Sequence, residues 1–141
     1  MYAAEIPIAL GKWSATHRVG FTINDSTPDI RFINDCATDP LFWYAQTTGT
    51  NPYLIKLNRM YMDGHPLDNC ASYYPPRPNI HHVVSTIAHE VGHALRIAHN
   101  TSDRSALMWP GVDSYFVCGT EDVTSDETTR LAALYPTLCG Q

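Results

Sequence analysis

The segment from His89 to His99, HEVGHALRIAH, holds the residues of this chain that are best suited to chemistry. On an α-helix, His89 and His93 lie one turn apart on the same face, so both imidazoles can reach one metal ion. Glu90 follows the first histidine. Zinc needs such nitrogens at about 2 Å, an open position for water, and a carboxylate that accepts the proton of that water. The spacing therefore indicates a zinc site that hydrolyses peptide bonds.

A third zinc ligand is needed, and His99 is the first candidate. It lies six residues beyond His93. On an unbroken helix it would therefore be rotated by about 240° round the helix axis from His93 and would point away from the metal. The helix must therefore end between the two histidines. The residue at the turn is Arg96, which a left-handed conformation would strain by about 1–2 kcal/mol. If His99 is not the ligand, the remaining candidates are acidic: Asp103, or the pair Glu121 and Asp122.

These residues resemble the long metzincin signature, HExxHxxGxxH, with Arg96 at the glycine position. Nine residues beyond His99 comes Met108, in SALMWPG, which resembles the Met-turn of the matrixin subgroup. The resemblance is strong from Val83 to Tyr135 and looser before that. It implies a secreted zinc endopeptidase in which the three histidines hold zinc. Glu90 would act as general base towards water whose pKa zinc lowers towards 7.

The resemblance also implies the shape of the substrate site. Met108 would form an apolar floor beneath the zinc ligands. Pro110, Gly111 and Val112 occupy the place of the segment that lines the S1′ pocket, where matrixins have a tyrosine instead of Val112. Some metzincins use a tyrosine two residues after the methionine as a further ligand, and Pro110 removes it here. An extended protein or peptide substrate would add to an edge strand above the cleft.

The expected fold is α+β and metzincin-like, a single domain over residues 1–141 with a twisted, mostly parallel sheet, an active-site helix and a C-terminal helix. Apolar spacing predicts a first helix over about residues 3–14, and alternation predicts strands at 19–23, 30–32 and 53–62. Thr124 and Glu127 fit a capping box that begins the last helix. The apolar stripe of the active-site helix should face the sheet: Val84, Ile87, Ala88, Val91 and Leu95.

Net charge argues against two classes of partner. The chain carries a net charge of −5 and has a pI near 5.7, whereas nucleic acids and anionic membranes favour a basic face. No apolar run approaches the ~20 residues that span a bilayer. We therefore expect neither nucleic acid nor a membrane as partner. With the peptidase interpretation, we expect a monomer that acts on proteins or peptides.

The four cysteines are scattered singly, which disfavours a zinc ribbon or a redox motif. Two disulfides in an oxidising compartment fit this pattern. Three pairings are open, and we favour Cys36 with Cys70 and Cys118 with Cys139, because each closes one loop-rich flank. Reduced buried thiols are the alternative. The sequence begins without the charged and apolar regions of a signal peptide and shows no cysteine-switch segment, so we expect a mature catalytic domain.

Other polar residues have simpler interpretations. His81 and His82 lie too far along the helix to share the metal, and we expect them to be solvent-exposed or to face substrate. His17 and His65 should be surface residues. The segment DGHPLDN, residues 63–69, leaves a calcium site open as an alternative to a plain loop. Asn24 and Asn100 begin glycosylation sequons. Asp126 and Glu127 occupy the place of two matrixin aspartates, although helix capping explains them equally well.

A catalytically silent binding module with the same fold is the main rival hypothesis, and a non-catalytic metal-binding protein is a third. Arg96 and the lack of the family's first strand favour the silent module. Glu90 argues against it, because a silent site gains nothing from a base beside the water.

Overall fold

The computed structural model describes residues 2–22, 26–35, 44–62, 79–111 and 120–137. It is an α+β structure, as the sequence predicts. In chain order its elements are α1 (Glu5–Ser14), β1 (Ile30–Asp35), β2 (Ala45–Thr48), β3 (Tyr53–Asn58), α2 (Arg59–Met62), α3 (Ile80–Ala94) and α5 (Ser125–Leu134).

The sheet has three strands in the order β1-β3-β2. β1 runs parallel to β3, with Ile30 opposite Tyr53, and β2 runs antiparallel to β3, with Ala45 opposite Leu57. The sheet is therefore mixed and not mostly parallel. β3 is its central strand, so in the described part of the chain β2 forms one edge.

The predicted strands are confirmed only in part. β1 extends three residues beyond the predicted strand at 30–32, and β3 ends at Asn58 although alternation continues to residue 62. There the chain turns into the short helix α2, which buries Met62 fully. The predicted strand at 19–23 is wrong for its described residues, 19–22, which have no regular structure. β2 was not predicted, because its four residues alternate too briefly to stand out from the surrounding loops.

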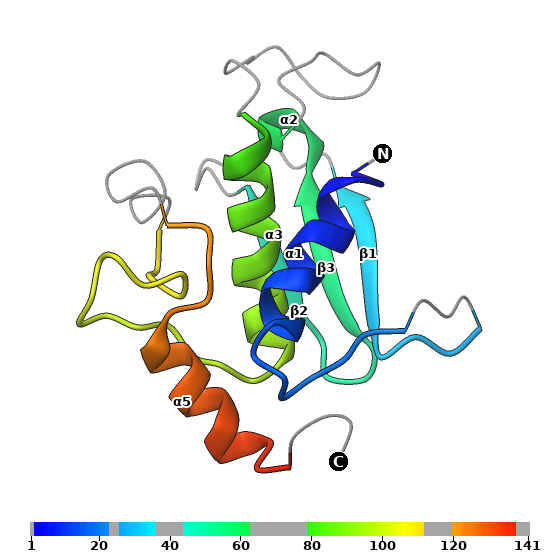
Figure 1. The fold of residues 1–141 in the computed structure, drawn as a ribbon. Helices are drawn as coiled ribbons and strands as arrows, with labels where there is room; N and C mark the ends of the chain where they lie inside the picture. The colour runs from blue at the N-terminus through cyan, green and yellow to red at the C-terminus, as the bar shows by residue number, and fades with distance from the viewer. Residues whose placement is uncertain (1, 23–25, 36–43, 63–78, 112–119, 138–141) are drawn as a thin grey trace.

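The helix α3 is the centre of the fold (Figure 1). Its apolar stripe is buried as predicted, and it packs against β2 and β3. α1 packs against α3 in turn, and Trp13 of α1 donates from Nε1 to the Ala88 carbonyl oxygen at 2.8 Å. The Asn79 side chain caps the first turn of α3 by accepting from the backbone N–H of His82. A buried helix held from both sides is a rigid support for functional side chains.

The end of α3 is a Schellman motif with an arginine at the position that usually holds glycine. The Arg96 N–H donates to the His93 carbonyl oxygen and the Ile97 N–H donates to the Gly92 carbonyl oxygen, both at 2.9 Å. Arg96 has φ +67, the left-handed conformation predicted for it. The helix therefore ends before His99, as the metal hypothesis requires.

The last helix begins as the sequence predicts, with a capping box formed by Thr124 and Glu127. Among the described residues, no helix is both long and apolar enough to cross a membrane. All four cysteines, the segment 63–69, Asn24 and Val112 lie outside the described residues, so their predictions stay predictions.

One prediction concerns the contact between α3 and its neighbours at Gly92. A Cβ there would overlap Met108 Sδ and would lie 2.7 Å from Trp13 Cζ2, whereas a Cβ at Gly11 on α1 meets nothing within 4 Å. Gly92→Ala should therefore lower the free energy of unfolding by about 1–3 kcal/mol through overpacking. Gly11→Ala should raise it by about 0.5–1 kcal/mol through helix propensity. Denaturant unfolding measures both, and equal effects would contradict this packing.

A second prediction concerns the turn at Arg96, whose side chain is exposed. Arg96→Gly should raise the free energy of unfolding by about 0.5–1 kcal/mol, because relief of left-handed strain exceeds the entropy that glycine adds to the unfolded chain. Ala98→Gly, two residues on and also exposed, is the control and should lower stability. Loss of stability in both variants would show that Arg96 is not strained.

Candidate metal centre

Three imidazoles converge where α3 ends. His99 Nε2 lies 3.3 Å from His89 Nε2 and 3.0 Å from His93 Nε2. The three rings are tilted relative to one another, and their centroids lie 4.5–5.2 Å apart. Among the described residues, this is the one group of three histidine, cysteine or acidic side chains that could hold a metal ion. The sequence prediction that these histidines come together is confirmed.

The separations of these nitrogens fit a zinc ion. Tetrahedral zinc with bonds of about 2.0–2.1 Å to nitrogen holds its ligand atoms about 3.3–3.4 Å apart. Three imidazole nitrogens this close repel one another through their lone pairs unless a cation lies between them. Three protein ligands would also leave the fourth position of a tetrahedral ion open.

Backbone carbonyl groups fix which ring nitrogen carries the proton in His89 and in His93. His89 Nδ1 lies 2.7 Å from the Leu107 carbonyl oxygen, and His93 Nδ1 lies 3.0 Å from that of Ile97. A carbonyl oxygen only accepts, so both Nδ1 atoms carry the proton and both Nε2 atoms offer a lone pair. This is the tautomer that metal binding requires.

Protonation is disfavoured at two of these imidazoles. Burial, with a smaller contribution from the neighbouring histidines, lowers the pKa of His89 to about 4, although the Leu107 carbonyl opposes this shift. Burial and then electrostatic repulsion from His93 lower the pKa of His99. Protons therefore compete weakly with a metal ion for the nitrogens of His89 and His99.

Glu90 is buried, with 7% of its surface exposed, and its carboxylate contacts the edge strand β2. The Thr47 hydroxyl lies 2.7 Å from Glu90 Oε2 and 2.8 Å from the Glu90 carbonyl oxygen. Burial raises the pKa of Glu90, and the hydrogen bond from Thr47 opposes that rise. A raised pKa suits a group that must accept a proton and later return it.

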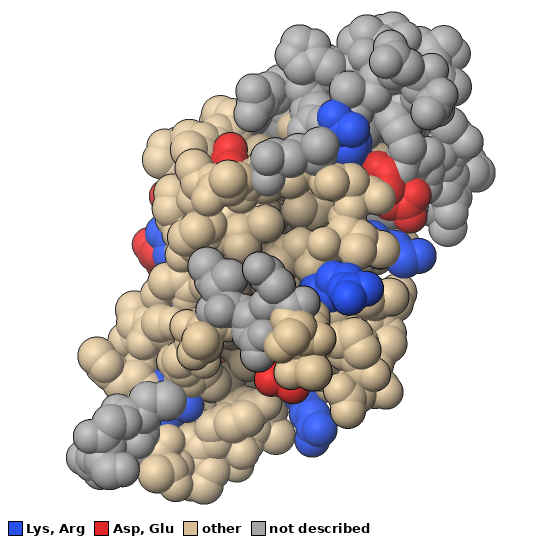
Figure 2. Space-filling model, turned by 90° about the vertical axis from the view of Figure 1, so that its right-hand side faces the viewer, with Lys and Arg blue, Asp and Glu red and all other residues tan. Residues whose placement is uncertain are grey.

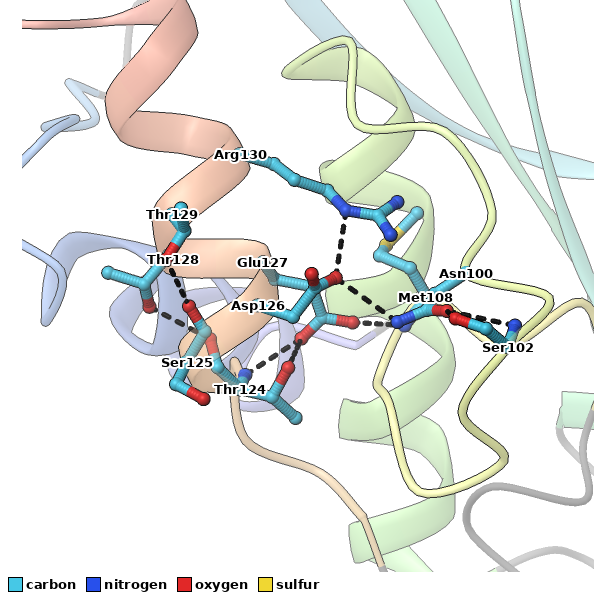
Figure 3. A network of polar contacts seen from close by, with 10 residues as sticks. All are labelled: Asn100, Ser102, Met108, Thr124, Ser125, Asp126, Glu127, Thr128, Thr129 and Arg130. Carbon is cyan, nitrogen blue, oxygen red and sulfur yellow. Dashed lines mark hydrogen bonds and ion pairs between the residues drawn. The ribbon is translucent and has the colours of Figure 1, made fainter.

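Met108, which the resemblance places beneath the zinc ligands, packs against α3. It is fully buried, and its sulfur packs against α3 at Gly92, next to His93. Its carbonyl oxygen accepts from the Asn100 N–H at 2.8 Å, and its N–H donates to Glu127 Oε1 at 2.6 Å. Backbone bonds on both sides therefore fix the turn that supports the site (Figure 3).

The acidic candidates for a third ligand are occupied elsewhere. The Asp103 carboxylate accepts from the N–H and hydroxyl of Ser105. Glu121 pairs with His81 at 3.1 Å, and Asp122 pairs with Lys12 at 2.6 Å. None of these carboxylates belongs to the histidine cluster within the described residues.

Asn100 is a structural residue of the site and a poor glycosylation acceptor. Its side chain is 3% exposed, its Nδ2 donates to Asp126 Oδ2 at 3.1 Å, and its Oδ1 accepts from the N–H and hydroxyl of Ser102. Asp126 also pairs with Arg130 at 2.8 Å. A sugar on Nδ2 would break this network, so the sequon does not mark an exposed acceptor in the folded chain.

Two expectations about the remaining residues differ in outcome. His82 is 1% exposed and packs edge-on against Tyr44, with ring centroids 4.7 Å apart. Its predicted exposure is therefore wrong, because the edge of the sheet covers that face of α3. His81 and His17 are exposed as predicted. Pro110 and Gly111 are exposed too, and their predicted role in the S1′ pocket stays a prediction. His65 lies outside the described residues.

No sequence pattern indicates the contact between Thr47 and Glu90, because a threonine in a polar loop has many roles. None indicates that the Met108 N–H donates to Glu127 either. The capping box alone identified Glu127, and it says nothing about the second carboxylate oxygen. Both contacts join segments far apart in the chain.

The surface charge is mixed on the side of the molecule that lies to the right in Figure 1, where β1 lies. Figure 2 shows Lys and Arg interspersed with Asp and Glu among mostly uncharged residues there. No continuous basic stripe crosses the described part of this face, in keeping with the net charge of −5.

No protein-family model matches this chain, and no curated protein is significantly similar to it.

The Thr47 hydroxyl should matter for the reactivity of Glu90 and little for the fold. Thr47→Val keeps the shape of the side chain and removes a hydrogen bond to a charged group, worth about 1.5–3 kcal/mol, so turnover should fall about 10-fold to 100-fold. Thr47→Ser should restore most of the turnover. Zinc affinity should stay unchanged in both. Thr48→Val, at an exposed position on the same strand, is the control, and equal losses in it would disprove a specific role.

Proposed function

We propose that this protein is a secreted zinc endopeptidase of metzincin type. The observation that carries the proposal is the convergence of three imidazoles: the Nε2 atoms of His89 and His93 lie 3.3 Å and 3.0 Å from His99 Nε2, beside the buried Glu90. A site that only stored metal would not need a carboxylate adjacent to the ligands. Secretion is part of the proposal because the scattered cysteines fit disulfides.

Glu90 is the group that moves the proton. Zinc held by the three imidazoles would lower the pKa of water and polarise the scissile carbonyl group. Glu90 accepts the proton of the attacking water and returns it to the leaving amine. Because burial raises the pKa of Glu90, the same carboxyl group can act in both directions near neutral pH.

Thr47 suits both protonation states of Glu90. When the carboxylate is ionised, the Thr47 hydroxyl donates to Oε2. When Glu90 carries the proton, its acid group can donate to the Thr47 oxygen while the hydroxyl turns to the Glu90 carbonyl oxygen, which lies 2.8 Å away. The contact therefore keeps the carboxyl group in place through a full cycle.

An extended peptide is the substrate that this arrangement favours. β2 pairs with β3 on one side, and in the described residues no strand pairs with its other side. Thr47 extends from β2 to Glu90, so this open edge lies beside the candidate metal centre. A substrate strand that added to β2 would bring its peptide groups to the site through main-chain hydrogen bonds.

The proposal is tested by paired variants and two measurements. Purified protein should bind one zinc ion per chain and cleave an unfolded protein substrate. Glu90→Ala should retain zinc and lose cleavage by at least about 100-fold, because the general base is removed. His99→Ala should weaken zinc binding by at least about 10-fold.

The outcomes separate the rival functions. Zinc binding without cleavage of any protein or peptide by the unmodified chain would favour the silent binding module. Cleavage that survives Glu90→Ala would show that the activity does not come from this site.

A further inference from the structure

Glu127 is fully buried although it lies in the first turn of a surface helix, α5. Three donors converge on its carboxylate. Oε2 accepts from the Thr124 N–H at 2.7 Å and from the Thr124 hydroxyl at 2.9 Å, and Oε1 accepts from the Met108 N–H at 2.6 Å. Capping of α5 uses only Oε2. The hydrogen bond that Oε1 accepts from the Met108 N–H is therefore not part of the helix cap.

The Met108 N–H belongs to the same peptide group as the Leu107 carbonyl. That carbonyl oxygen lies 2.7 Å from His89 Nδ1. One rigid, planar peptide group therefore accepts from His89 at one end and donates to Glu127 at the other. A chain of contacts therefore runs from the Glu127 carboxylate through the Leu107–Met108 peptide group to the His89 imidazole, whose Nε2 faces the candidate metal site.

We propose that Glu127 is a positioning residue that strengthens metal binding through His89, acting across the Leu107–Met108 peptide group. This inference rests on the proposed zinc site. A carboxylate at the N–H end polarises the peptide and makes its carbonyl oxygen a stronger acceptor, because hydrogen bonds in a chain reinforce one another. The stronger acceptor draws the Nδ1 proton and raises the electron density at Nε2.

His93 provides an internal comparison. Its Nδ1 also donates to a carbonyl oxygen, that of Ile97, at 3.0 Å instead of 2.7 Å. That carbonyl belongs to the peptide group between Ile97 and Ala98, whose N–H has no contact with Glu127. The shorter bond is thus the one whose peptide group is held by the buried carboxylate.

The neighbouring Asp126 provides a matched control. It lies in the same turn of α5 and also carries a carboxylate, but it is exposed and contacts the side chains of Asn100 and Arg130, not the Met108 N–H (Figure 3). Asp126→Asn removes the same charge and leaves the bonds of Glu127 intact. A general effect of charge on the site would appear in both variants.

The experiment measures Zn²⁺ affinity by competition with a chromophoric chelator in the unmodified protein, Glu127→Gln and Asp126→Asn. Glu127→Gln should weaken zinc binding about 10-fold, in the range known for groups that support metal ligands. Asp126→Asn should change it by less than about twofold. If Glu127→Gln does not fold, Glu127→Asp, which keeps the charge and draws it back from Met108, should also weaken binding.

A second measurement separates this role from a loosened structure. In the zinc-bound protein, NMR should show the Nδ1 proton of His89 shifted upfield in the Glu127 variant, with that of His93 unchanged. Equal shifts at both histidines, an unchanged zinc affinity, or an equal loss in Asp126→Asn would overturn the inference. If the unmodified protein binds no zinc, the proposed function fails with it; if it binds zinc and Glu127→Gln binds equally well, the inference alone fails.

Discussion

The reversal of the chain at Arg96 is the constraint on which the candidate site depends. An α-helix can present His89 and His93 together, but His99 reaches them only if the helix ends between His93 and Ile97. The Schellman bonds at this point use the backbone of the site itself, since the His93 carbonyl accepts from Arg96 while the His93 ring donates to the Ile97 carbonyl. The same turn ends the helix and orients a ligand.

Support for the site comes from four separate segments of the chain. α1 reaches α3 through the bond from Trp13 to Ala88, and β2 reaches Glu90 through Thr47. The loop after α3 packs Met108 against Gly92 of that helix, and α5 holds this loop because Glu127 accepts from the Met108 N–H. Each segment makes its contact through a buried or half-buried group. The loss of one contact is therefore not easily compensated by the others.

The polar groups around the site follow one pattern. His89 and His93 each donate to a backbone carbonyl, and Glu90 faces a hydroxyl that can donate or accept. Backbone carbonyls belong to fixed loops and cannot rotate away, whereas side-chain partners can. The candidate ligands are thereby held in place by the fold, which would lower the entropy cost of binding a metal ion.

The sequence alone determined the parts that depend on local spacing: the pair His89 and His93 on one helical face, the left-handed turn at Arg96 that His99 requires, and the capping box of α5. These follow from helix geometry and backbone sterics over a few residues. Only the tertiary structure decided that β2 forms and that its Thr47 contacts Glu90. It also decided that His82 is buried and that the Met108 N–H donates to Glu127. Those features join distant segments, and no local periodicity records which distant groups will meet.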